Sequence, residues 1–342
     1  MSLEDEARDR VVVLINSGAG AFVGRPDAAR EMADTLVAAF DRLGWPAMSH
    51  LARGPDLAVA AETASRAGAR ALVVAGGDGT LASVAQALCA SPVPVPPMAV
   101  FPVGTANLLA RDLCMPEDPE AAVAALVEGV VGRIDVGRIN GRVFLNSVIL
   151  GLFANVARQR ERFRHAMTPL LWGRLVWRLV TAVRRWPRLR AVLMTEKGAV
   201  RVRTHAMVVA DNAYAARPGL WLRRDSLGHG ALALYVLRHR SLWQWLRLVL
   251  GLMVAGTWQR DADLLTEDVR RLNVVVRRRV IRATVDGEVV LLPPRLRFRV
   301  EPAALSVWVP AEAASVLARV DGSALDLLAS PTGAPTYRDE SP

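Results

Sequence analysis

The feature that most constrains the fold of this chain is a glycine-rich pentapeptide, Gly76-Gly77-Asp78-Gly79-Thr80. An apolar run at residues 71–75 precedes it, and apolar residues recur after it at helical spacing over residues 81–88. The pattern therefore predicts a tight loop that leaves a buried strand and begins a helix. Glycines allow close approach to the backbone, and the N–H groups at a helix start favour a bound anion. The pentapeptide predicts a phosphate site, although a tight structural connection explains a glycine turn equally well.

The pentapeptide differs from two common phosphate-binding sequences. No Gly-Lys-Ser/Thr follows it, so it is not a Walker loop, and its spacing does not fit the dinucleotide glycine fingerprint. Asp78 stands between the glycines. A carboxylate beside bound phosphates is typical of sites where Mg²⁺ accompanies a nucleotide, and this favours the functional interpretation.

The same order of strand, loop and helix recurs in residues 10–133. Apolar runs at residues 11–15 and 98–102 each lead into a loop of small and polar residues. Repetition of this pattern predicts a doubly wound α/β domain whose ligand site lies at the carboxyl ends of the strands. For Thr105 and Asn107, ordinary turn and cap roles remain the alternative. The expected nucleotide-binding residues are Asn16, Gly18, Gly20, Gly76, Gly77, Asp78, Gly79, Thr80, Thr105 and Asn107.

Residues 134–310 follow a different pattern. Short, often alternating β-rich segments separated by turn residues predict an antiparallel, sandwich-like domain. Residues 311–329 have a helical pattern, and from Ser330 onward the composition predicts a disordered tail.

Charge is distributed unevenly along the 342 residues. Residues 1–150 carry 12 arginines, no lysine and 17 acidic residues, whereas the remainder carries 31 basic and 16 acidic residues. Lys197 is the only lysine, so the excess is almost entirely arginine. A general compositional bias toward arginine is one explanation. An anionic partner for the second half is the other.

Residues 171–186 illustrate both explanations. They predict a helix with an apolar stripe and an opposite face that carries Arg174, Arg178 and Arg185. This face is either simply solvated or lies against an anionic membrane surface. No segment is long and apolar enough to predict a transmembrane helix, and the acidic first residues do not resemble a signal peptide. We expect a cytoplasmic, peripherally membrane-associated protein and no nucleic-acid partner, and the sequence does not decide between a monomer and a homodimer.

The three loops together resemble the diacylglycerol kinase catalytic-domain family, which includes soluble bacterial lipid kinases and the sphingosine kinases. The resemblance rests on the pentapeptide, on Asn16 to Gly20 and on Pro102-Val103-Gly104-Thr105-Ala106-Asn107. The first loop departs from the usual Asn-Pro-x-Ser-Gly. In the third, Leu108 stands where the family usually has an aspartate.

The resemblance implies a kinase that transfers the γ-phosphoryl group of ATP, accompanied by Mg²⁺, to the hydroxyl of a diacylglycerol-like or sphingoid lipid. It implies catalytic roles for Asp78 and for Glu288, the latter as the base on the lipid hydroxyl. From the residues alone, Asp286-Gly287-Glu288 is most simply a hairpin turn.

One departure affects the metal. Bacterial relatives often carry Leu-Asp-Asp-Gly where this chain has Leu227-Gly228-His229-Gly230, so we assign no residue as a metal ligand. Two other functions remain open. One is an NAD kinase-like enzyme, since NAD kinases share the Gly-Gly-Asp-Gly loop. The other is a catalytically weak nucleotide- or lipid-binding protein.

Overall fold

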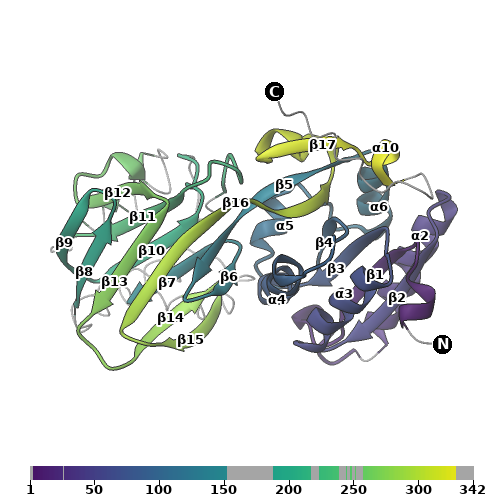
Figure 1. Ribbon diagram of the computed structural model, residues 1–342, viewed down its shortest axis with the longest axis horizontal. Coiled ribbons are helices and arrows are strands. Elements are labelled where there is room, and N and C mark those ends of the chain that lie inside the picture. Colours follow the sequence, from purple (N-terminus) through teal and green to yellow (C-terminus); the bar gives the residue numbers. More distant parts are fainter. Residues whose placement is uncertain are drawn as a thin grey trace, which may run out of the picture. The chain divides into compact units, whose positions relative to one another are not determined.

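The computed structural model describes residues 3–25, 27–151, 188–216, 223–238, 244, 247–248, 251 and 257–328 (Figure 1). The helix predicted over residues 171–186 and the tail from Ser330 lie outside these residues. The chain forms two compact units, one of Met1–Ile134 with Ala303–Pro342 and one of Asp135–Pro302. The chain passes from one unit to the other within strand β5 (Val130–Ile139) and again within strand β16 (Arg295–Val309). The boundary within β16, between residues 302 and 303, lies earlier than the boundary expected at residue 310.

The first unit is built on a parallel sheet with the strand order β2-β1-β3-β4. Its strands are β1 (Val11–Asn16), β2 (Ala47–Ala52), β3 (Ala71–Gly76) and β4 (Met98–Pro102). The buried apolar runs predicted β1, β3 and β4 correctly. The sequence analysis missed β2 because its residues are mostly half-buried and show neither a continuous apolar run nor a clear alternation.

Helices cover both faces of this sheet. They are α1 (Leu3–Glu6), η1 (Gly20–Phe22), α2 (Ala28–Arg42), α3 (Asp56–Arg66), α4 (Asp78–Ala90), α5 (Leu108–Asp112) and α6 (Pro119–Val127). The connection from β1 to β2 runs in one direction across the sheet. The connections from β2 to β3 and from β3 to β4 run in the opposite direction. Right-handed crossovers therefore place α2 on one face and α3 with α4 on the opposite face, in agreement with the packing of α3 on α4 and of α2 on α6. The order reverses between β1 and β3, where doubly wound sheets bind ligands.

The last segments of the chain complete the first unit. Within β16, Val307 pairs with Met98 of β4, and the neighbouring Trp308 is fully buried. Its ring stacks on Trp45, and its Nε1 donates to the carbonyl oxygen of Leu126 at 2.7 Å. Trp308 is thus held through both its ring and its N–H, and it fixes the end of β16 within the first unit.

The helical pattern predicted over residues 311–329 was wrong in its centre. The segment contains η4 (Ala311–Val316), strand β17 (Arg319–Ser323) and α10 (Ala324–Leu328). β17 pairs antiparallel with the Val130–Arg133 part of β5. The partner strand lies almost 190 residues earlier, so local periodicity did not reveal the pairing.

The second unit is an antiparallel sandwich, as the sequence predicted. One sheet has the order β16-β13-β8-β9 and the other β12-β11-β10-β7-β14-β15, while β6 pairs with β5. The strands are β6 (Arg142–Phe144), β7 (Ser147–Gly151), β8 (Leu189–Thr195), β9 (Gly198–Thr204), β10 (Ala206–Asp211), β11 (Leu232–Leu237), β12 (Leu264–Val269), β13 (Arg271–Val276), β14 (Ile281–Val285) and β15 (Glu288–Leu292), with η3 (Trp258–Arg260) beside β12.

The core of the sandwich comes from alternate residues of both sheets. On β13, Leu272, Val274 and Val276 point into it. The second sheet contributes residues such as Leu150 and Leu234. This period of two is the physical basis of the fold, because it gives each strand one buried face. None of the described helices is long and apolar enough to cross a membrane.

Candidate functional site

The three predicted loops lie side by side at one edge of the first unit's sheet. β1 ends at Asn16, β3 at Gly76 and β4 at Pro102, and Gly76 pairs directly with Pro102. Since the strands are parallel and adjacent, their following loops emerge together. The expected convergence of the loops is therefore present in the fold, at the point where the strand order reverses.

A hydrogen bond joins the first loop to the second. Asn16 Nδ2 donates to Thr80 Oγ1 at 2.7 Å, and Asn16 Oδ1 accepts the N–H of Gly18 at 3.0 Å. Gly76 makes this geometry possible, because a Cβ at that position would lie 2.6 Å from Thr80 Cβ. The side chain of Thr80 therefore lies over the bare backbone of Gly76 and is held there by the first loop.

Asp78 joins the second loop to the third. Its Oδ1 accepts the N–H groups of Leu108 at 2.9 Å and Leu109 at 3.3 Å, which are the first two residues of α5. A carboxylate at a helix start satisfies N–H groups that have no partner within the helix. The sequence suggested only a role beside phosphates for this residue, and the structure adds a structural one.

The second and third loops also touch through their glycines. A Cβ on Gly104 would lie 2.5 Å from the Cα of Gly77 and 2.7 Å from Asn107 Oδ1. These distances are shorter than any real Cβ contact, so only glycine fits at position 104. The Gly20 position is less crowded, since a Cβ there would lie 3.6 Å from Thr105 Oγ1.

Asn107 has an unusual environment. It has a left-handed conformation with φ of 49°, it precedes α5, and it is only 7% exposed. Its Oδ1 has no hydrogen-bond partner within the described residues. A buried acceptor without a donor is costly, and a donor group from a bound ligand would satisfy it.

The first helical turn of α4 completes the arrangement. Gly77 is its N-cap, and Asp78, Gly79 and Thr80 form the first turn. The positive end of the helix dipole and the N–H groups of this turn provide an anion site built from backbone. We call the three loops with this turn the glycine cradle. Chemically, it can hold the phosphates of a nucleotide.

No group of three or more histidine, cysteine, aspartate or glutamate residues suited to a metal ion occurs in the described part of the chain. Mg²⁺ that accompanies a nucleotide needs only one or two carboxylates in addition to phosphate oxygens. In the glycine cradle, Asp78 is the carboxylate in position to contribute, and it already accepts two N–H groups.

In the second unit, Asp286 and Gly287 form the turn between β14 and β15. Val285 pairs with Glu288 across it, and the φ angles of Asp286 and Gly287 are 46° and 87°. Both central residues of a two-residue hairpin loop of this kind need positive φ, which explains the Asp-Gly sequence. The hairpin interpretation is therefore correct, and it is compatible with a further role for Glu288.

The side chain of Asp286 is buried and anchors this turn. Its carboxylate accepts the N–H groups of Leu145 at 2.8 Å, Asn146 at 2.9 Å and Ser147 at 3.0 Å. Its own N–H donates to the carbonyl oxygen of Ser147 at 3.0 Å. These bonds tie the hairpin to the start of β7 and hold the following Glu288 at the end of a rigid strand pair.

Glu288 itself is accessible to a substrate. Its side chain is 55% exposed, and its Oε2 lies 3.1 Å from Arg142 Nη2. An exposed ion pair of this kind contributes little stability, so the carboxylate can exchange partners at small cost.

A buried charge cluster lies beneath the hairpin. Arg224, which is 2% exposed, donates through Nη1 to the carbonyl oxygens of Leu145 at 2.7 Å and Asp211 at 2.8 Å. Burial raises the pKa of the Asp211 carboxyl well above its usual range, the positive charge of Arg224 opposes this rise, and the carboxylates of Asp135 and Asp286 add to it. One cation thus stands among three carboxylates.

The segment Leu227-Gly228-His229-Gly230 makes hydrogen bonds through its backbone. The N–H of Gly230 donates to Asp135 Oδ2 at 2.6 Å, and the N–H of His229 donates to Asn212 Oδ1 at 2.9 Å. His229 is exposed. The sequence analysis assigned no site role to Asp135, Asp211 or Arg224, and a buried arginine gives no local signal that distinguishes it from a surface one.

Comparisons with known proteins agree with this architecture. Residues 10–139 match the family model of the diacylglycerol kinase catalytic domain. A curated diacylglycerol kinase from Staphylococcus aureus (strain bovine RF122 / ET3-1) is 30% identical over 135 residues, which are 39% of this chain and 42% of that protein. The diacylglycerol kinase of strain JH9 is 31% identical over 129 residues, 37% of this chain and 40% of that protein. The chain thus spans about two fifths of the length of the curated relatives it matches.

A solved structure extends the likeness of the fold to both units. The crystal structure of a diacylglycerol kinase from Bacillus anthracis str. Sterne superposes with a TM-score of 0.63 at 15% identity, covering 89% of this chain and 98% of that one. At that identity the superposition supports the fold alone. Taken with the matched loops, these comparisons show that residues 10–139 are similar in sequence to the diacylglycerol kinase catalytic domain.

Proposed function

We propose that this protein is an ATP-dependent lipid kinase that transfers the γ-phosphoryl group to a hydroxyl of a diacylglycerol-like or sphingoid lipid. The observation that carries the proposal is the glycine cradle. Bonds from Asn16 to Thr80 and from Asp78 to α5 bring three glycine loops together over a helix start. Such a surface suits a triphosphate, and the family resemblance supplies the lipid acceptor.

In this proposal the cradle's N–H groups hold the phosphates, and the orphan Oδ1 of Asn107 accepts a donor from the nucleotide. Phosphoryl transfer has a loose transition state, so positioning and charge neutralisation provide most of the catalysis. Bound Mg²⁺ would supply part of that neutralisation, with Asp78 as the nearby carboxylate. We further propose that the protein acts at the cytoplasmic surface of a membrane.

We propose Glu288 as the base that accepts the proton of the lipid hydroxyl. Its exposure, its weak pairing with Arg142 and its rigid hairpin support this role. A positioned base contributes roughly 100- to 10,000-fold in rate. The Glu288→Gln variant should therefore bind ATP like the parent and lose turnover by about that factor.

Glu120→Gln is the matched control for this variant. Glu120 is also an exposed glutamate paired with an arginine, at 2.8 Å from Arg42 Nη2, but it lies on α6. Its substitution should leave turnover unchanged. Parent-like turnover in Glu288→Gln would remove Glu288 from the mechanism.

The substrate is tested with labelled ATP, a total lipid extract and NAD in parallel reactions, followed by identification of the labelled product. A phosphorylated lipid supports the proposal. Labelled NADP as the product would replace it with an NAD kinase activity. Nucleotide binding without any labelled product would indicate a catalytically weak binding protein.

A further inference from the structure

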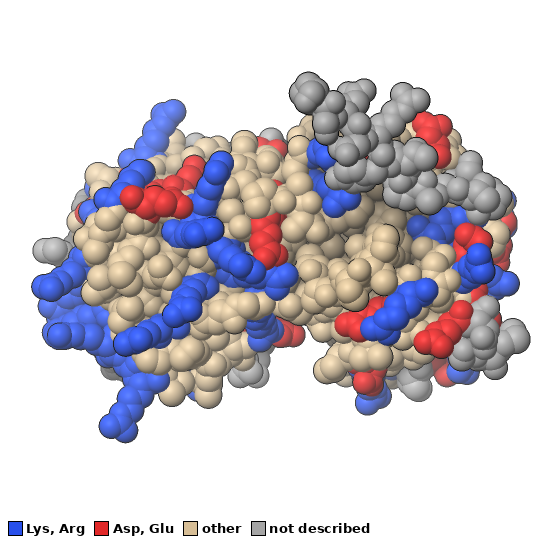
Figure 2. Space-filling view, viewed as in Figure 1, with Lys and Arg blue, Asp and Glu red and all other residues tan. Residues whose placement is uncertain are grey.

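One face of the second unit carries an unusual concentration of arginine. The sheet β16-β13-β8-β9 buries alternate residues in the sandwich core, and the residues between them point outward. Figure 2 shows basic side chains spread over the part of the molecule where Figure 1 labels these strands. We call this outward surface the arginine face. Its basic residues are Arg190, Arg201, Arg203, Arg271, Arg295, Arg297 and Arg299.

The strand register gives the layout of this face. One row across the four strands consists of Arg201, Val192, Val275 and Arg295, since these residues are cross-strand partners in turn. The two central valines are half-buried, and Met194 in the next row is 36% exposed. The face therefore has a small apolar centre with arginines on both sides.

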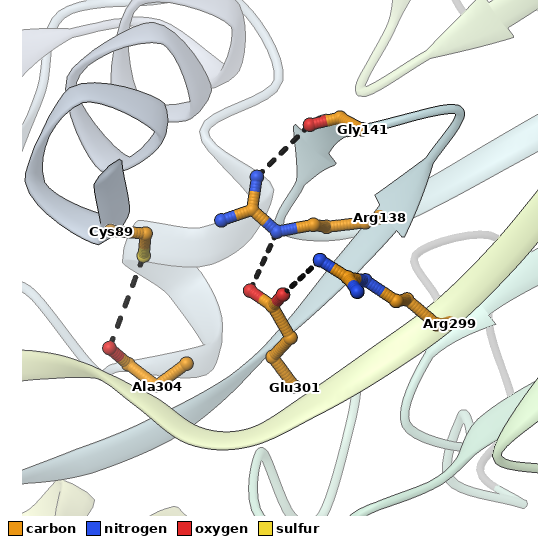
Figure 3. Close-up of polar contacts among 6 residues, drawn as sticks. All are labelled: Cys89, Arg138, Gly141, Arg299, Glu301 and Ala304. Carbon is orange, nitrogen blue, oxygen red and sulfur yellow. Dashed lines mark hydrogen bonds and ion pairs between the residues drawn. The ribbon is translucent and has the colours of Figure 1, made fainter.

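Charges on the face are poorly compensated within the protein. Within the described residues, Glu301 is the acid that pairs with one of its arginine side chains, accepting from Arg299 Nη2 at 2.7 Å. The same carboxylate also accepts from Arg138 Nε at 2.6 Å, so its charge is shared between two cations (Figure 3). The other six arginine side chains have no ion-pair partner in the part of the chain that the structure describes.

Like charges also stand directly opposite each other. Arg190 is the cross-strand partner of Arg203, and Arg271 is that of Arg299. Opposed like charges destabilise a sheet, and an anionic surface laid against them would relieve the repulsion.

We propose that the arginine face docks on the surface of an anionic lipid bilayer. A sheet that presents guanidinium groups around partly exposed apolar side chains complements lipid phosphates above a shallow apolar region. A nucleic acid fits less well. The outward residues of the face include no aromatic side chain on which a base could stack, and a face four strands wide is broader than the two-stranded ribbon that a major groove admits. The choice of a membrane over other polyanions rests on the proposed lipid substrate.

The test measures sedimentation of the full chain with two kinds of vesicle, phosphatidylcholine alone and phosphatidylcholine mixed with phosphatidylglycerol. The parent should bind only the mixed vesicles and should be released at 1 M salt, where the Debye length is about 3 Å. Each arginine near such a surface contributes about a fivefold factor in partitioning. A variant that combines Arg190→Gln, Arg201→Gln and Arg297→Gln should therefore partition about 100-fold more weakly.

The matched control combines Arg8→Gln, Arg10→Gln and Arg30→Gln. These exposed residues belong to the first unit, and the control removes the same net charge. It should bind mixed vesicles almost as the parent does. Equal loss in the control would show that net charge alone governs binding and would overturn the proposal, as would parent-like binding by the arginine-face variant.

Two further measurements separate this proposal from its alternatives. If the parent binds duplex DNA but not mixed vesicles, the docking proposal is wrong. Phosphorylation of lipid in neutral detergent micelles tests the kinase function separately, and the arginine-face variant should keep that activity. Face-dependent vesicle binding by a protein that phosphorylates no lipid would leave the docking surface intact and refute the kinase.

Discussion

Replacing Gly104 with alanine tests whether the contact between the second and third loops shapes the glycine cradle. The new Cβ would lie 2.5 Å from the Cα of Gly77 and 2.7 Å from Asn107 Oδ1. Ordinary carbon contacts begin near 3.5 Å, so the loops must separate by about 1 Å. Because Gly77 offers only backbone at this point, no flexible side chain can move aside to absorb the strain.

The expected loss of stability follows from similar overpacked sites, where an added methyl group lowers the free energy of unfolding by about 1–3 kcal/mol. For a unit of this size, each kcal/mol lowers the melting temperature by roughly 2–4 °C, so we expect a decrease of about 2–12 °C. Separation of the loops also lengthens the bonds from Asp78 to the start of α5, which set the shape of the anion site. ATP affinity should fall by about tenfold or more.

Gly20→Ala is the control for the melting temperature, since its Cβ would lie 3.6 Å from the nearest atom, Thr105 Oγ1. Thermal denaturation and titration with a fluorescent ATP analogue measure both effects on the same preparation. If Gly104→Ala melts and binds ATP like the parent, the two loops do not press on each other as described, and the steric account of the cradle is wrong.

Three other substitutions test individual charges. Asp78→Asn keeps an oxygen that can accept the N–H groups of α5, so it should melt like the parent and lose phosphoryl transfer, whereas full turnover would reduce Asp78 to a helix cap. Arg224→Met removes the cation of a buried cluster and should lower stability in urea by about 3–5 kcal/mol, while the exposed Arg277→Met should not; equal midpoints would contradict the cluster's role. Burial raises the pKa of Asp211, so the folded state retains this proton to higher pH than the unfolded chain, and this contribution to stability decreases as the pH rises above about 4. Asp211→Asn should therefore stabilise the protein at pH 7 relative to the parent but not at pH 4, and identical pH profiles would refute this assignment.

The glycine cradle was predictable because its signals are local. Each loop directly follows an apolar run in the sequence, and parallel strands in a doubly wound sheet bring such loops to one edge. The order of the loops was therefore sufficient to place Asn16, Asp78 and Asn107 together. The structural role of Asp78 was not predictable, because its partners at Leu108 and Leu109 are 30 residues away.

Features that depend on distant pairing escaped the sequence analysis. β17 forms on β5 although its own sequence continues a helical pattern, and Arg224 is buried because Leu145 and Asp211 offer it carbonyl oxygens. In both cases the stabilising partner lies far away in the chain. Intrinsic propensity and periodicity describe only neighbours in sequence, so they predict neither the strand nor the buried cation.

On the arginine face, the positions of the arginines are more informative about function than their number. A bias toward arginine would place arginines at the outward positions of any strand, because the inward positions belong to the core. Outward orientation is therefore no evidence for a partner. Compositional bias does not by itself explain why arginines stand opposite each other at Arg190 and Arg203 while their charges lack acidic partners among the described residues. Neighbouring acidic residues would remove the repulsion between the opposed arginines within the protein. The repulsion remains, and this favours an external anionic surface.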